Sequence, residues 1–76
     1  MHAWTAGQVL EAPRGRKLFI TDVIPFSQLN EPDANPEGFL IKFVFNEAEV
    51  HDQRAMKYEL DDFMFEQMCQ AEGFGD

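Results

Sequence analysis

The clearest structural signal in the sequence is FLIKFVFN, residues Phe39–Asn46. Its β-branched and aromatic residues favour a strand, and its alternation places Phe39, Ile41, Phe43 and Phe45 on one face. We expect this apolar face to form the core of the protein.

The segments on both sides of this central strand are also typical of strands. Gln53–Leu60 alternates again after a polar connection at Glu47–Asp52, which predicts an antiparallel hairpin with the central strand. Towards the N-terminus, Leu18–Phe26 is predicted as a strand that Pro25 ends or places at an edge, and Gly7–Ala12 as a shorter strand.

Turn-forming residues separate these predicted strands. Pro13–Lys17 is a turn that carries three of the six lysines and arginines. Ser27–Gly38 contains two prolines, two asparagines and three acids, so we expect a long loop there.

A helix is predicted over Asp62–Glu72. Asp61 suits the N-cap position, Leu60 and Phe65 fall at the positions of a hydrophobic staple, and Gly73 can take the left-handed conformation after the last turn. Phe74 would then fold back on Cys69, and Phe63 falls towards one flank. The apolar residues at helical spacing form a stripe suited to a sheet: Met64, Phe65, Met68, Cys69 and Ala71.

These elements predict one α+β domain over residues 1–76, with three or four antiparallel strands and a C-terminal helix packed on one face. A small OB-like or SH3-like barrel closed by the helix is the alternative. With 45% apolar residues the chain has the material for a core. Because the single cysteine excludes an internal disulfide and the two histidines show no metal-ligand spacing, we expect a homodimer to supply further burial.

Charge and hydropathy limit the partners. The net charge of −8 opposes direct binding to nucleic acid or to an anionic membrane. No apolar stretch is long enough for a membrane span and no secretory signal is evident, so we expect a cytoplasmic protein.

No residue pattern indicates an enzyme, a metal site or a cofactor site. Cys69 lies on the apolar stripe of the predicted helix, where a thiol is inert, and the His51–Asp52 pair is typical of a solvated loop. The basic turn at Arg14–Lys17 matches no phosphate-binding loop. A single-strand nucleic-acid binder that uses this turn with Phe19 or Tyr58 is an outside alternative.

The distribution of the acids is the most informative feature. No cation follows Lys57, and five of the six acids beyond it form the first candidate partner-binding group: Glu59, Asp61, Asp62, Glu66 and Glu72. A second group in the hairpin connection would extend it if the fold brings both to one side: Glu47, Glu49 and Asp52. Residues two apart on a strand, or one turn apart on a helix, are separated by roughly 6 Å, which approaches the spacing of nucleic-acid phosphates.

Small size, strong acidity, a compact sheet with one helix and no catalytic set together resemble the small phage-encoded inhibitors of host machinery, such as DNA mimics and anti-CRISPR proteins. The resemblance is in overall build along the chain and rests on no motif. It implies a monomeric or dimeric blocker of a DNA- or RNA-handling enzyme in the host cytoplasm, such as a gyrase, an RNA polymerase, a restriction enzyme or a CRISPR effector.

The leading hypothesis is therefore a protein-binding inhibitor whose acids mimic phosphates and occupy the basic groove of a host nucleic-acid-binding protein. The alternative is a small structural or assembly protein that contacts itself or a partner through Phe, Met and Trp4.

Overall fold

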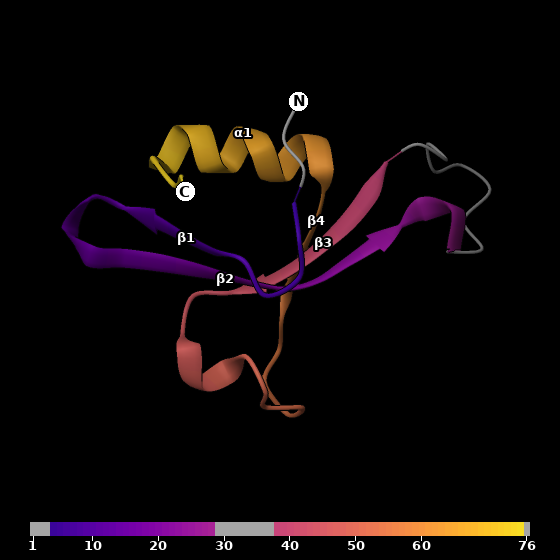
Figure 1. Ribbon diagram of the computed structural model, residues 1–76, viewed down its shortest axis with the longest axis horizontal. Helices are drawn as coiled ribbons and strands as arrows, with labels where there is room; N and C mark the ends of the chain where they lie inside the picture. The colour runs from indigo at the N-terminus through magenta and orange to yellow at the C-terminus, as the bar shows by residue number, and fades with distance from the viewer. Residues whose placement is uncertain (1–3, 29–37, 76) are drawn as a thin grey trace.

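The computed structural model describes residues 4–28 and 38–75, which form one antiparallel sheet with a helix on one face (Figure 1). The strands follow one another in the order β1-β2-β3-β4, so the predicted α+β architecture is confirmed. β1 and β4 are the two edges of an open sheet, and the barrel alternative is wrong. The strand and helix bounds are β1 Val9–Ala12, β2 Arg16–Pro25, β3 Phe39–Val44, β4 Tyr58–Asp61 and α1 Asp62–Glu72.

The long strand β2 pairs with β1 on one side and with β3 on the other, and these two neighbours lie beside different parts of it. Its first part pairs with β1, from Ala12 opposite Arg16 to Val9 opposite Phe19. Pairing with β3 begins only at Phe19 and continues to Pro25, with a bulge between Ile20 and Asp22. The two ends of β2 therefore support different parts of the molecule, and its first residues have β1 on one side only.

The turn between β1 and β2 is tighter than the sequence predicts. Arg14 and Gly15 both take left-handed backbone conformations, with φ of 71° and 73°, so Pro13–Gly15 complete the turn. Arg16 and Lys17, which the sequence assigns to the turn, belong to β2. Glycine adopts this conformation without steric cost, whereas Arg14 has a Cβ atom and is strained there.

The core lies between the sheet and α1. Buried apolar side chains come from every strand except β4, and from the helix and the residues after it: Leu10, Leu18, Ile20, Ile41, Phe43, Phe65, Cys69 and Phe74. The ring of Phe65 contacts Phe43 on β3 and Trp4 near the N-terminus, with centroid distances of 5.1 and 4.9 Å. These contacts fix the helix on the sheet.

Both predicted ends of α1 are confirmed. The Asp61 carboxylate accepts a hydrogen bond from the Met64 N–H at 2.7 Å, and Leu60 packs against the cluster that contains Phe65. At the other end Gly73 is left-handed, and the Phe74 N–H donates to the Cys69 carbonyl at 2.8 Å. Next to Phe74, Gly75 exchanges two backbone hydrogen bonds with Glu11 on the outer edge of β1.

The structure corrects the prediction for Gln53–Leu60. Only Tyr58–Asp61 form a strand, and Met56, which falls within the predicted strand, lies outside it and is 89% exposed. Asn46 and Asp52 accept hydrogen bonds from the N–H groups of Ala48 and Arg54, and such local bonds stabilise turns in place of a strand. The connection between β3 and β4 is therefore longer than predicted and includes the 3-10 helix η3 (Glu47–Glu49).

Other exposed residues also differ from the predicted core faces. Phe39 and Phe45 are 40% and 45% exposed because they lie at the two ends of the β3 face that α1 covers only in its middle. On the helix, Phe65 and Cys69 are buried as predicted, but Met64 and Ala71 are exposed. Of the predicted loop Ser27–Gly38, residues 29–37 lie outside the described residues, after the 3-10 helix η2 (Phe26–Gln28).

Within the described residues, no helix is long and apolar enough to cross a membrane.

The strained turn gives a first prediction. Arg14→Gly should raise the free energy of unfolding by about 1 kcal/mol, because glycine relieves the left-handed strain. Arg14→Ala removes the same charge but keeps the strain, so it should give no such gain. Urea denaturation of the three proteins tests this, and equal gains in both variants would attribute the effect to charge instead.

The helix cap gives a second prediction. Asp61→Ala should lower the free energy of unfolding by about 1 kcal/mol, because the Met64 N–H loses its acceptor. Asp61→Asn retains a capping oxygen and should remain within a few tenths of a kcal/mol of the parent. The measurement is again urea denaturation, and an equal loss in both variants would show that the charge matters more than the cap.

Candidate functional site

The structure does not bring the candidate reactive side chains of the sequence together. No group of three or more His, Cys, Asp or Glu residues among them could hold a metal ion. His51 is exposed in the connection after η3, whereas Cys69 lies on the buried face of α1, so the two are not paired. Burial, and then the negative charge of Glu66, raises the pKa of the Cys69 thiol to about 11. A thiol in this state is protonated and inert at neutral pH.

Several of the predicted partner-binding acids already have partners within the chain. Glu59 lies 3.3 Å from the Lys42 ammonium on the neighbouring strand, and Glu72 lies 2.9 Å from the Arg16 guanidinium. Their charges are thus partly compensated.

The acids at the start of α1 form a different group. Asp61 caps the helix, and Asp62 in the first turn accepts a hydrogen bond from the Phe63 N–H at 3.0 Å. Glu66 follows one turn later. Among the described residues, no cation forms an ion pair with Asp61 or Asp62, and between these acids Phe63 is 63% exposed. The start of α1 is therefore a negative surface with an exposed aromatic ring, and we call Asp61, Asp62, Phe63 and Glu66 the acidic end.

The two groups of acids do not form one row. The connection that holds Glu47, Glu49 and Asp52 lies on the opposite side of the sheet from α1 (Figure 1). Along α1 itself the outward ridge is exposed and uncharged, formed by Phe63, Met64, Gln67, Gln70 and Ala71. Apart from Glu72, the acids of α1 therefore lie at the acidic end.

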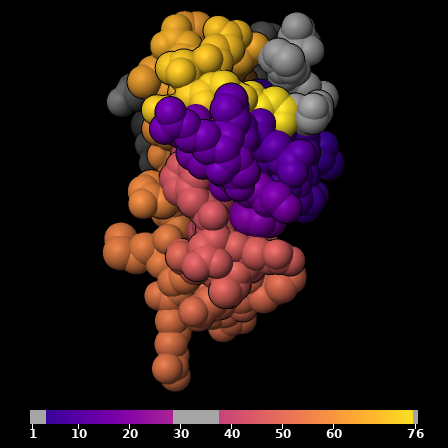
Figure 2. Space-filling view, turned by 90° about the vertical axis from the view of Figure 1, so that its left-hand side faces the viewer, coloured from indigo at the N-terminus to yellow at the C-terminus, as the bar shows by residue number. Residues whose placement is uncertain are grey.

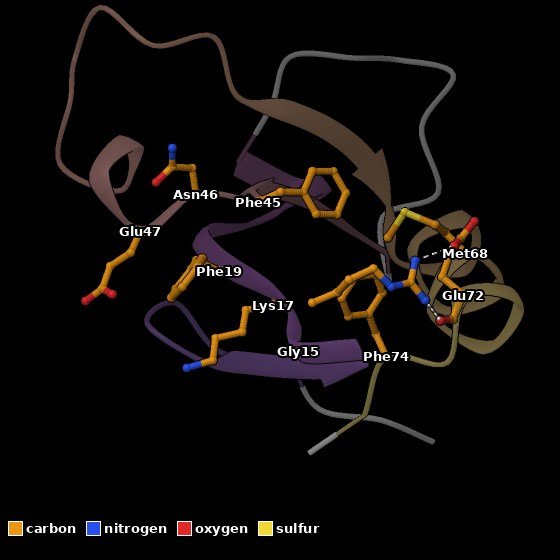
Figure 3. Close-up of a pocket in the computed structure, with 10 residues that line it drawn as sticks. Gly15, Lys17, Phe19, Phe45, Asn46, Glu47, Met68, Glu72 and Phe74 are labelled. Atoms are coloured by element: carbon orange, nitrogen blue, oxygen red, sulfur yellow. Dashed lines mark hydrogen bonds and ion pairs between the residues drawn. The ribbon is translucent and has the colours of Figure 1, made fainter. Parts of the chain in front are cut away.

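A hollow of about 770 Å³ lies at the opposite end of α1, and the sequence did not predict it. Figure 3 shows its lining, which comes from the start of β2, the chain after β3 and the end of α1: Gly15, Arg16, Lys17, Phe19, Phe45, Asn46, Glu47, Met68, Glu72 and Phe74. In Figure 2 the β1–β2 hairpin lies between the end of α1 above and the chain after β3 below. We call this hollow the fork, because β2 and the chain after β3 diverge around it.

Arg16 closes one side of the fork. Its guanidinium donates to the Glu72 carboxylate at 2.9 Å and to the Glu72 carbonyl at 2.7 Å, and it lies over the Phe74 ring at 5.4 Å from the centroid. The carbonyl is one of those left without a partner at the end of a helix, so Arg16 also caps α1. This contact holds the end of the helix against the start of β2.

The fork brings together residues that the sequence assigned to unrelated roles. Phe45 was expected in the core, and Arg16 and Lys17 in a solvated turn. One sequence signal points to the fork: the apolar face of the central strand continues to Phe45, beyond the part of the strand that one short helix can cover. The hollow itself forms only because the chain bends at Phe45.

In comparisons with known proteins, the chain matches no family model, no curated protein and no solved structure.

The buried thiol gives a prediction about pH. Because the folded-state pKa of Cys69 is about 11 and the unfolded value is 9.0, the unfolded state loses this proton first as the pH rises. The free energy of unfolding should therefore fall between about pH 9 and pH 11, with a contribution from this group of about 2 kcal/mol. The Cys69→Ala variant lacks that contribution, so the difference between the two stability curves, measured by denaturant unfolding at each pH, isolates it. Parallel curves would contradict the prediction.

Proposed function

We propose that this protein is a non-catalytic inhibitor that binds a host DNA- or RNA-handling protein through its acidic end. The observation that carries the proposal is the group Asp61, Asp62 and Glu66 around the exposed ring of Phe63. Nucleic-acid-binding grooves are cationic, and a surface with complementary charge speeds association and selects the partner. An exposed aromatic ring among the charges adds the apolar contact that protein interfaces typically contain.

The geometry narrows the set of acids that would mimic phosphates. Asp62 and Glu66 are separated by about 6 Å of axial rise, close to the spacing of phosphates along a strand. Glu59 and Glu72 contribute less than Asp61 and Asp62, because a cation lies beside each of them. A gyrase, an RNA polymerase, a restriction enzyme or a CRISPR effector in the host cytoplasm is the class of target that this surface fits, and the net charge of −8 disfavours direct binding to nucleic acid.

Neutral isosteres test the acidic end without removing the helix cap. We expect Asp62→Asn combined with Glu66→Gln to weaken target binding by roughly tenfold or more, because two charges are lost from the contact. The experiment is capture from bacterial lysate on the immobilised protein, with elution in steps of rising salt and identification by mass spectrometry. Asp61 stays unchanged, because charge reversal there would also destabilise α1.

The matched control is Glu47→Gln combined with Glu49→Gln, which changes the net charge by the same amount on the other side of the sheet. We expect this control to capture the same nucleic-acid-handling enzyme as the parent, and duplex DNA to displace that enzyme. If both double variants lost the same amount of binding, the effect would come from the net charge of the protein and not from the acidic end. If duplex DNA did not displace the captured enzyme, the proposal that the acids mimic phosphates would be overturned.

The exposed apolar side chains favour a second candidate, assembly with copies of itself or with a structural partner. Met56, Tyr58 and Phe63 are 89%, 57% and 63% exposed. In the same experiment this function would appear as binding that persists at high salt, since apolar contacts are not screened. A homodimer formed by pairing β4 with its copy is disfavoured, because Glu59 and Asp61 would face like charges across the two strands.

A further inference from the structure

Two hydrogen bonds between β2 and β3 fix the direction of the backbone groups of β3. The Phe26 N–H donates to the Gly38 carbonyl at 3.0 Å, just before β3 begins. Further along, the Thr21 hydroxyl of β2 donates to the Lys42 carbonyl at 3.2 Å. Backbone direction alternates along a strand, so the even-numbered residues of β3 turn their N–H and C=O groups towards β2. The odd-numbered residues therefore turn theirs towards β4.

The register of β4 then shows which of its backbone groups are open. Tyr58 and Leu60 lie opposite two odd-numbered residues of β3, so their N–H and C=O groups face that strand. Those of Glu59 and Asp61 point outwards, where no strand within residues 4–28 and 38–75 pairs with them. The carbonyl of an N-cap residue already accepts the first bond of its helix. The open groups are therefore both backbone groups of Glu59 and the N–H of Asp61, and we call this outer side of Tyr58–Asp61 the β4 edge.

On the side of the sheet that carries α1, the β4 edge is apolar. Tyr58 and Leu60 lie opposite buried residues of β3, and Leu60 packs against the core cluster. The Tyr58 ring is 57% exposed and contacts the Phe45 ring, itself 45% exposed, with centroids 5.4 Å apart. A strand added at the β4 edge would place alternate side chains beside Leu60 and Tyr58, and apolar residues suit those positions.

On the other side of the sheet the β4 edge is acidic, most strongly where β4 meets α1. Glu59 points to this side, as does Lys42, whose ammonium lies 3.3 Å away, and Lys57 directly precedes the strand. At the far end of the strand Asp61 is followed by Asp62, and neither forms an ion pair with a cation in the part of the chain that the structure describes. A strand added here meets its strongest negative charge at that end, so basic residues suit the positions beside Glu59 and Asp61.

The β4 edge also lacks the features that usually prevent strand addition. Tyr58–Asp61 contain no proline, no lysine and no bulge. Their acids repel a second copy of the same strand but attract a basic one. The edge of β1 differs, because Gly75 already exchanges two backbone hydrogen bonds with Glu11 there.

We propose that the β4 edge binds an extended segment of the target protein, in which basic and apolar residues alternate, as an added antiparallel strand. Its basic side chains lie beside Glu59 and Asp61, its apolar side chains lie beside Tyr58 and Leu60, and its backbone bonds to that of Glu59. The direction follows the sheet, in which all neighbouring strands are antiparallel.

This inference rests on the proposed function for the class of partner, because proteins that handle nucleic acids are rich in lysine and arginine where they bind it. β4 leads directly into α1 (Figure 1), so a segment on the β4 edge continues the contact that the acidic end makes. The acidic end provides charge, whereas the β4 edge adds backbone hydrogen bonds that fix the register of the partner.

A synthetic peptide tests the inference on the full chain. The probe is a fluorescein-labelled peptide with the order serine, valine, arginine, valine, arginine, valine, serine. We expect saturable binding by fluorescence anisotropy below about 1 mM, the range of weak specific contacts. In ¹⁵N-labelled protein the Glu59 amide should exchange more slowly with solvent when the peptide is bound. The Leu60 amide, which faces β3, should keep its exchange rate.

Two control peptides separate alternation from charge. In the order serine, valine, valine, arginine, arginine, valine, serine, the two arginines fall on opposite faces of an extended strand. This peptide has the same composition and should bind at least about threefold more weakly. Glutamate in place of both arginines should weaken binding by at least about tenfold. Equal affinity of the two arginine peptides would overturn the inference.

Backbone methylation of the peptide tests the hydrogen bonds without any change in the protein. In an antiparallel pair, residues directly opposite each other place their side chains on the same face, so the residue that bonds to the Glu59 backbone is an arginine. N-methylation of either arginine should therefore weaken binding by about threefold to tenfold, whereas N-methylation of the central valine should have no effect. A loss at the valine, at every position or at none would contradict strand addition.

Paired variants locate the site on the protein. Glu59→Pro removes an outward N–H, a change that an edge strand tolerates, and Glu59→Gln removes the same charge but keeps the N–H. The proline variant should therefore bind the peptide at least about threefold more weakly than the glutamine variant. Tyr58→Ala should lose several-fold, whereas Val9→Ala, an exposed apolar residue of β1, should keep the parent affinity. Equal binding by the two Glu59 variants would overturn the inference.

The inference and the proposed function can fail separately. Asp62→Asn combined with Glu66→Gln leaves the β4 edge unchanged, so it should stay within about threefold of the parent affinity for the peptide while it loses the captured enzyme. If the enzyme were captured but the parent protein did not bind the peptide, the inference would fail and the proposed function would stand. Binding of the peptide in the predicted register without capture of any nucleic-acid-handling enzyme would support the strand site and contradict the proposed function.

Discussion

Phe65 packs its ring against Phe43 from above the sheet and against Trp4 from the side, and it is fully buried. This contact determines where α1 crosses the sheet, and therefore where both ends of the helix lie. One end begins directly after β4 with the Asp61 cap, and the other is held to β2 through Arg16 and Glu72. The acidic end and the fork are both consequences of how this one helix is placed. A small domain buries little surface, so few other contacts could replace it.

The acids and the cations of the chain are unevenly distributed in space. The acids near the start of α1 are far in sequence from the cations of the β1–β2 turn, and the helix keeps them apart in space (Figure 1). Where opposite charges do meet, as at Arg16 and Glu72 or at Lys42 and Glu59, they link elements of the fold. Exposed pairs such as these add little stability individually, but that between Arg16 and Glu72 also caps the helix and borders the fork.

The fork shows how incomplete strand pairing can create a hollow. β2 continues beyond the end of β3, because the bend at Phe45 sends the chain into η3. A longer β3 would have satisfied the Lys17 backbone and filled the hollow. The capping bond of Asn46 to Ala48 stabilises the bend, so a local side-chain interaction leaves a hollow beside an open strand edge.

Local sequence patterns determined the elements and most of the core. The alternation in Phe39–Asn46, the cap at Asp61 and the left-handed Gly73 each act within a few residues, so the central strand and both helix ends could be predicted. Acidity was also evident, including the group at the start of α1. Only the tertiary structure decided which acids share a side, that Met56 leaves the predicted strand, and that Arg16, Phe45, Met68 and Phe74 surround one hollow. Those features depend on where β2 and β3 separate and where α1 ends over them, and contacts between residues so far apart in sequence leave no periodic pattern along the chain.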